Sequence, residues 1–206
     1  MQPAQREWFS PRPLSTRRIL EDIQERCQTE ALDAKPLFMM ARLARSPEDA
    51  GDLLQATLCI RAAAARHSRR LEAVGGEYYA AAFVRACIAC DAPEVLAEGL
   101  RRANEAGLQL TYRAVHEGLI HWAAQLDLTK MGMILQAMHD SGLPPTTRTA
   151  YTAIRAAVNS ARLDIAEMYA SRFQAAGVRL NDATQQFLAL ARQRHRDREA
   201  AMNGSM

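Results

Sequence analysis

Apolar residues recur at intervals of three and four positions along most of the chain, from Leu14 to Leu190. The alternation of apolar and polar residues that marks a half-buried β-strand is hardly found. A spacing of three and four positions places side chains on one face of an α-helix. The pattern therefore predicts an all-α fold.

Three helices are expected in the first third of the chain, over residues 15–31, 37–44 and 47–71. The third has the strongest start signal. Ser46 can cap it, Pro47 fits its first turn, and the two acids that follow complement the helix dipole.

The chain repeats itself after residue 76. A small residue, a glycine and an apolar residue come together at an interval of 35 residues, at Ala106-Gly107-Leu108, Ser141-Gly142-Leu143 and Ala176-Gly177-Val178. Each glycine follows an amphipathic segment, as expected where a helix ends in the left-handed conformation. A short polar break divides each unit into two predicted helices. In the first break we expect Asp91 to cap the second helix and Pro93 to begin it.

One helix pair of this length cannot bury its own apolar face, so neighbouring pairs must stack. The sequence therefore predicts an α-solenoid of stacked 35-residue helix-turn-helix repeats. The expected divisions are an N-terminal extension with one or two helices (1–40), a degenerate helical repeat (41–76), three repeats (77–111, 112–146 and 147–181), a partial repeat (182–192) and a basic C-terminal tail (193–206).

The repeat resembles the pentatricopeptide repeat family. The segments Gly142-Leu143-Pro144-Pro145-Thr146 and Gly177-Val178-Arg179-Leu180-Asn181 are similar to that family's repeat ending, and Leu163-Asp164-Ile165-Ala166 is similar to its second-helix opening. The tetratricopeptide repeat is a near competitor, but its unit has ~34 residues and its Trp, Gly, Tyr and Pro pattern is absent here. The resemblance covers residues 77 to about 192.

This resemblance implies an organellar protein that binds single-stranded RNA, one base per repeat. Counting back from each glycine puts the family's base-reading pairs at Ala81 with Thr111, His116 with Thr146, and Tyr151 with Asn181. The family normally has Asn, Ser or Thr at the first position of each pair, and this chain does not. The resemblance therefore implies a short, degenerate member that acts as an accessory subunit of the mitochondrial ribosome and contacts rRNA phosphates and neighbouring proteins.

The chain is mildly basic. The 26 basic residues against 23 acidic ones give a net charge of +3, and only Lys35 and Lys130 among the basic residues are lysine. Arginine suits phosphate recognition because its planar guanidinium donates in a fork. The family's first helices line its concave surface, so we expect RNA contacts there and on the basic tail, from Arg113, His116, Arg148, Tyr151, Arg155, Asn181, Arg192, Arg194, Arg196 and Arg198.

Residues 1–20 carry four arginines against one glutamate, which is typical of an organelle transit segment. We therefore expect a mitochondrial matrix protein, with a plastid as the other possibility. No apolar stretch reaches the ~20 residues that a membrane span needs.

Catalysis, metal binding and cofactor binding have no support in the sequence. The histidines lack metal-ligand spacing, and Cys87 and Cys90 form half of a zinc motif at most, so we interpret them as core residues. Two other functions stay open. One is a protein-binding scaffold, such as an accessory or assembly subunit of a respiratory complex, and the other is a freely acting RNA-processing factor, which would need more repeats.

Overall fold

The computed structural model describes residues 14–67 and 76–203, and this part of the chain consists of helices and connecting turns without any strand. The prediction of an all-α fold is confirmed. In chain order the helices are α1 (Thr16–Arg26), α2 (Lys35–Leu43), α3 (Pro47–Arg66), α4 (Gly76–Ala89), α5 (Pro93–Arg101), α6 (Ala103–Ala106), α7 (Tyr112–Ala124), α8 (Leu128–Asp140), α9 (Thr147–Asn159), α10 (Leu163–Ala175) and α11 (Asp182–Asn203).

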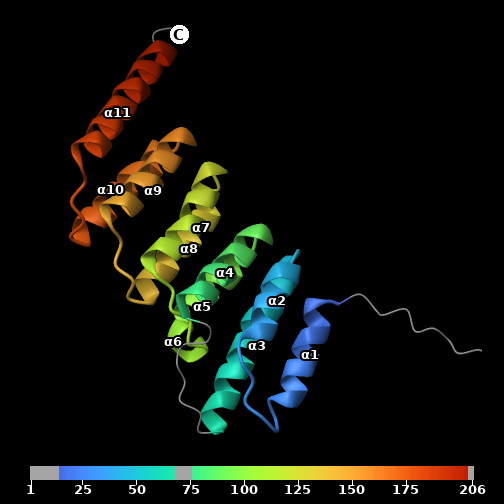
Figure 1. Ribbon diagram of the computed structural model, residues 1–206. Helices are drawn as coiled ribbons and strands as arrows, with labels where there is room; N and C mark the ends of the chain where they lie inside the picture. Colours follow the sequence, from blue (N-terminus) through green and yellow to red (C-terminus); the bar gives the residue numbers. More distant parts are fainter. Residues whose placement is uncertain (1–13, 68–75, 204–206) are drawn as a thin grey trace, which may run out of the picture.

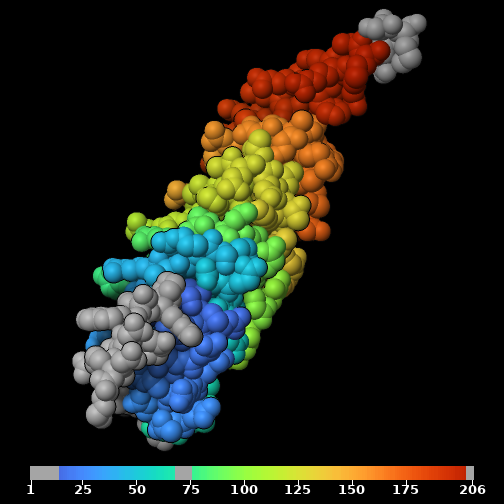
Figure 2. All heavy atoms as spheres, turned by 90° about the vertical axis from the view of Figure 1, so that its right-hand side faces the viewer, coloured from blue at the N-terminus to red at the C-terminus, as the bar shows by residue number. Residues whose placement is uncertain are grey.

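The helices from α4 onward form hairpins that follow one another along the molecule (Figure 1). The pairs are α4 with α5, α7 with α8, and α9 with α10, and the one-turn helix α6 follows α5 directly. The first helices α4, α7, α9 and α11 contact one another in that order, and α5 packs closely on α8. The molecule is therefore elongated, with α11 projecting at one end (Figure 2).

Helix starts fall at the predicted unit boundaries. Helices α7, α9 and α11 begin at Tyr112, Thr147 and Asp182, which are the first residues of the second, third and partial units. The glycines Gly107, Gly142 and Gly177 have φ values of 64°, 72° and 79°, as predicted for residues that end a helix. In each case the amide of the next residue donates to the carbonyl five positions back, at 2.9 Å.

A second residue with left-handed backbone occurs in each of the three units. The sequence does not predict it, because none of these residues is a glycine. These residues lie 35 positions apart in the breaks between paired helices, at Asp91, Leu126 and Ala161, with φ values of 49°, 59° and 56°. The residue after each one donates its amide to the carbonyl five positions back, at 2.8, 3.1 and 2.9 Å. The hairpin turn and the turn between units therefore share one backbone geometry.

The predicted capping role of Asp91 is wrong. Ala92 occupies the N-cap position of α5 without a side-chain bond, although Pro93 does begin the helix as expected. A left-handed residue lies before the N-cap, so the Asp91 carboxylate extends toward the next hairpin instead. It accepts hydrogen bonds from Trp122 Nε1 at 3.0 Å and from Lys130 Nζ at 2.6 Å.

The N-terminal helices differ from the expected bounds while keeping the expected cap. Helix α3 begins with the predicted capping box, in which Ser46 Oγ accepts from the Asp49 amide at 3.2 Å and the Asp49 carboxylate accepts from the Ser46 amide at 3.1 Å. The predicted boundary at 41 falls inside α2, which packs on α3 and α4. The predicted end of the third helix at 71 and the arginine-bearing segment 1–13 lie outside the described residues.

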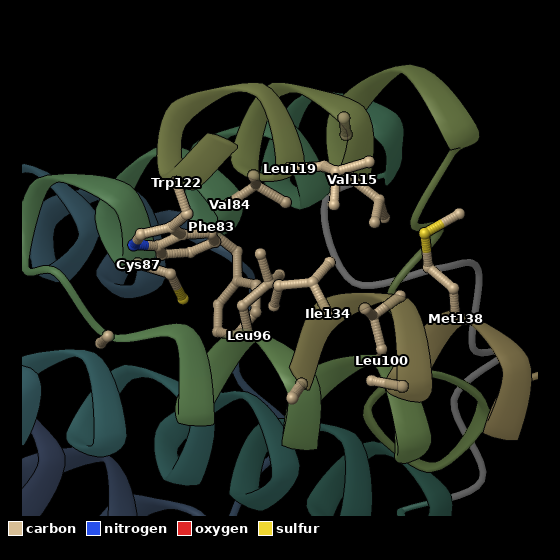
Figure 3. Close-up of a cluster of buried hydrophobic side chains, with 14 of the residues drawn as sticks. Phe83, Val84, Cys87, Leu96, Leu100, Val115, Leu119, Trp122, Ile134 and Met138 are labelled. Carbon is tan, nitrogen blue, oxygen red and sulfur yellow. The ribbon is translucent and has the colours of Figure 1, made fainter. Parts of the chain in front are cut away.

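The core runs through successive hairpins without a break. In Figure 3, α4 contributes Phe83, α5 contributes Leu96, α7 contributes Trp122 and α8 contributes Ile134 to one cluster, and all four are fully buried. Burying one such side chain stabilises the fold by roughly 1.5–3 kcal/mol. Cys87 lies in the same cluster, and both it and Cys90 are buried free thiols, which confirms their interpretation as core residues.

Candidate nucleic-acid interface

The layer of first helices carries a groove of about 490 Å³ between α7 and α9. Helix α7 contributes an apolar wall that includes Ile120. Helix α9 contributes side chains at positions three, four and seven apart, namely Arg148, Tyr151, Thr152 and Arg155, and Asn159 at its C-terminal end. This spacing places them along one face of the helix.

The cations in this groove have no acidic partner. The Arg155 guanidinium lies 5.9 Å from the centre of the Tyr151 ring, and its Nη1 is 3.4 Å from the Tyr151 hydroxyl. No carboxylate lines the groove, and among the described residues neither Arg148 nor Arg155 forms an ion pair. An arginine held against a ring and free of counter-charge is well placed to contact an anion.

A second groove of about 270 Å³ adjoins the first, between the end of α9 and α11. Asn159 lines both. The apolar part of the second groove includes Phe187 and Leu190 of α11. The same face of α11 continues into Arg194, His195 and Arg198. The two adjoining grooves form one surface, here called the inner arginine face, defined by Arg148, Tyr151, Arg155, Asn159, Arg194 and Arg198.

Positive charge is not spread over the whole layer. Between α4 and α7, Arg85 Nε lies 3.6 Å from the Glu117 carboxylate, so that part of the layer is close to neutral. Arg113 is exposed on α7 but does not line the groove. The arginines that line the two grooves therefore come from α9 and α11.

His116 is placed differently from the prediction of a base-stacking role. Its side chain is only 3% exposed, and its ring stacks on Tyr112 with centroids 5.2 Å apart. Its Nδ1 is 3.3 Å from the Tyr112 hydroxyl, which also hydrogen-bonds to Thr146 and Thr149. Burial, with Arg148 nearby, lowers the pKa of His116. A base could not reach this ring without unpacking the helix.

Asn181 has a local structural role. Its side-chain oxygen accepts from the Thr184 amide at 2.9 Å at the start of α11. Thr111 and Thr146, at the equivalent positions, accept from Ala114 and Thr149 at 3.3 Å. The polar residues that the resemblance assigned to base reading therefore cap the first helix of the following unit.

The basic tail is a continuation of α11 as far as Asn203, with no break at 193. Its arginines divide between two sides. Arg194 and Arg198 line the second groove, whereas Arg192 pairs with Glu167 at 2.9 Å and Arg196 bonds to Gln193 at 2.8 Å. Of the ten predicted contacts, five lie on the inner arginine face, namely Arg148, Tyr151, Arg155, Arg194 and Arg198.

Sequence reasoning missed Asn159, which lines both grooves. Asn159 lies at the last position of α9, and Arg194 lies 35 residues later, at the equivalent position of the next unit. Thr152 and His195 also line the surface. Alignment of the units at their 35-residue interval would have shown that Asn159 and Arg194 share a place.

Comparison with protein-family models, curated proteins and solved structures gives no match to this chain. Within residues 14–67 and 76–203, no group of three or more histidine, cysteine or acidic side chains is arranged to hold a metal ion. Over the same ranges no helix has the combination of length and hydropathy that crossing a membrane requires.

Proposed function

We propose that this chain is a short pentatricopeptide-type solenoid that holds RNA on its inner arginine face. In this proposal it serves as a structural, RNA-associated subunit of an organellar ribonucleoprotein, namely the mitochondrial ribosome. The single observation that carries the proposal is the set of four arginines, Arg148, Arg155, Arg194 and Arg198, over two adjoining grooves without a lining carboxylate.

The repeat geometry supports the family part of the proposal. Two left-handed turns per unit, each recurring at 35 residues, require every helix pair to have nearly the same length and turn. Helix pairs of this kind, stacked through their first helices, are the expected form of a solenoid repeat.

The proposed mode of binding is phosphate contact rather than base reading. At the base-reading positions, His116 is buried and Thr111, Thr146 and Asn181 cap helices, so Tyr151 is the one residue of these pairs that lines a groove. Arginine contacts to phosphate fix the position of a strand without selecting its sequence. Tyr151, half-buried beside Arg155, offers an aromatic ring with which an unpaired base could stack.

Salt dependence of RNA binding tests the proposal. Fluorescence anisotropy of a labelled single-stranded RNA with the full chain should show an affinity that falls steeply as salt rises. Each phosphate contact contributes about 0.7 to the slope of log K against log salt for single strands. The double variant Arg148→Ala and Arg155→Ala should therefore bind more weakly and lose about 1.4 from that slope.

The matched control is Arg101→Ala together with Arg162→Ala. Both arginines are exposed, and each pairs with an aspartate, Arg101 with Asp140 and Arg162 with Asp164. The same loss of charge should leave the slope nearly unchanged. No measurable RNA retention at low salt would contradict the proposal and favour the protein-binding scaffold.

A further inference from the structure

The second helices do not pack evenly along the molecule. Helix α8 packs closely on α5, but it hardly touches α10. A groove of about 210 Å³ lies between α8 and α10 instead, and we call it the outer groove. Helices α7, α8 and α10 all pack on α9, so the two hairpins stay joined although their second helices are apart.

The lining of the outer groove is mainly apolar. Helix α8 contributes Leu135 and Met138, and α10 contributes Met168, Tyr169 and Phe173. Met168 is 39% exposed. It lies on the side of α10 that faces the groove, and closer packing of α8 on α10 would cover it. Methionine side chains adapt to different partner shapes, so a groove lined by them suits an inserted apolar side chain.

Gly132 keeps the groove open. A Cβ atom at this position would lie 3.6 Å from the Tyr169 hydroxyl, which is ordinary van der Waals contact. Alanine would therefore fit, but a longer side chain would occupy the space between the two helices.

The polar groups at the rim include no carboxylate. His139 and Arg172 line the groove, and no aspartate or glutamate does. Burial raises the pKa of the Tyr169 hydroxyl, and the nearby Arg172 guanidinium opposes that shift. Within the described part of the chain, neither the Arg172 guanidinium nor the Tyr169 hydroxyl has a hydrogen-bonding partner. A guanidinium beside a free hydroxyl forms a donor set that fits a carboxylate.

We propose that the outer groove binds a segment of a partner protein that is helical and amphipathic, with leucine-type side chains flanked by glutamate or aspartate. The apolar side chains would insert between α8 and α10, and a carboxylate would accept from Arg172 and Tyr169. This is recognition of a helix in a groove, with orientation set by charge. The proposal does not depend on RNA binding, because the inner arginine face lies on the layer of first helices.

A labelled peptide probe tests the proposal. The probe is a helical peptide with leucines at positions i, i+3 and i+7 and glutamates beside them, and its counterpart carries lysines in place of the glutamates. Anisotropy with the full chain should show saturable binding of the acidic peptide, at least about tenfold tighter than that of the basic one. Absence of saturable binding of the acidic peptide would overturn the proposal.

Two variants locate the binding. Gly132→Leu fills the groove without removing a contact and should weaken binding of the acidic peptide at least about tenfold. Arg172→Glu should invert the preference in favour of the basic peptide. The matched control is Arg179→Glu, with the same charge change at an exposed position outside the groove. If Gly132→Leu fails to fold by circular dichroism, the Arg172→Glu inversion decides the question.

The double variant Arg148→Ala and Arg155→Ala separates this proposal from RNA binding. It should lose RNA affinity and keep peptide affinity. Two results would overturn the proposal. Binding of the acidic peptide could disappear in this double variant, or Arg172→Glu could leave the preference for the acidic peptide unchanged. Either result would mean that the peptide binds the inner arginine face and not the outer groove.

Discussion

Single residues in the hairpin turns carry a cost that glycine would avoid. Leu126 and Ala161 hold φ values of 59° and 56°, where a Cβ atom crowds the following carbonyl. This conformation costs an L-residue roughly 1–2 kcal/mol. The glycines at the turns between units avoid that cost, so the two kinds of turn have the same geometry and different local stability.

Replacing Ala161 with glycine should therefore stabilise the protein. We expect Ala161→Gly to raise the free energy of unfolding by about 0.5–1 kcal/mol, after the greater chain entropy of glycine is subtracted. Urea denaturation followed by circular dichroism measures the change. The control, Ala62→Gly at an exposed position inside α3, should lower the free energy of unfolding by about 1 kcal/mol. A loss of stability in Ala161→Gly would contradict the assigned turn geometry.

His116 makes stability depend on pH in a defined direction. Burial first, and then Arg148, lower the pKa of this side chain in the folded state, and its Nε2 has no hydrogen-bonding partner. The unfolded chain therefore takes up the proton first, near a pH of about 6.5. The contribution of neutral His116 to the free energy of unfolding is therefore complete above that pH, and it is lost as the pH falls below it.

We expect His116→Phe to reduce the loss of stability between about pH 7.5 and pH 5.5, because phenylalanine can keep the stack on Tyr112 without a titrating group. Thermal melting at a series of pH values measures this. His139→Gln, at a strongly exposed position, is the control and should keep the wild-type profile. An equally steep profile in His116→Phe would show that another group causes the acid sensitivity.

At the scale of elements, one side chain connects two hairpins. Asp91, in the turn between α4 and α5, accepts from Trp122 on α7 and Lys130 on α8. Hydrogen bonds from Lys130 and then Trp122 lower the pKa of Asp91. Although the carboxylate itself is about half exposed, at 54%, Trp122 is fully buried, so its indole N–H depends on this acceptor.

We expect Asp91→Ala to destabilise the protein by about 1–3 kcal/mol, because the buried indole N–H is left without a partner. Asp91→Asn should cost much less, since asparagine keeps an acceptor oxygen and tolerates the left-handed conformation. Chemical denaturation with tryptophan fluorescence as the probe measures both variants. Equal losses in the two would indicate that the charge, rather than the acceptor, stabilises the turn.

The elements themselves were largely predictable, for identifiable reasons. Glycine at 107, 142 and 177 and a capping residue at Thr111, Thr146 and Asn181 specify the turns between units by residue type. The turns at Leu126 and Ala161 have no glycine, so residue type does not mark their left-handed position. Asp91 was wrongly expected to cap α5, because an aspartate two residues before a proline is a common start signal and the sequence does not show that its backbone is left-handed.

At the scale of the whole molecule, the inner arginine face could be predicted in part. Arg148 and Arg155 share a face of α9 with Tyr151, which helix periodicity alone indicates. Which arginines are neutralised depends on distances between helices, as the pairing of Arg192 with Glu167 illustrates. His116 occupies the position equivalent to Tyr151 but is buried, because Tyr112 packs on it. The 35-residue repeat predicts that the two positions are equivalent, but it does not show which of them is covered. The outer groove was not predictable, since it results from the uneven spacing of α8 and α10.

Mapping of RNA crosslinks on the full chain tests the central claim most directly. A single-stranded RNA that carries photoreactive uridines is irradiated with the protein at low salt, and modified residues are located by mass spectrometry. We predict adducts concentrated on α9 and α11 at Tyr151, His195 and their neighbours, and their loss when Arg148 and Arg155 become alanine. Adducts confined to α8 and α10, or no adducts at all, would contradict the account.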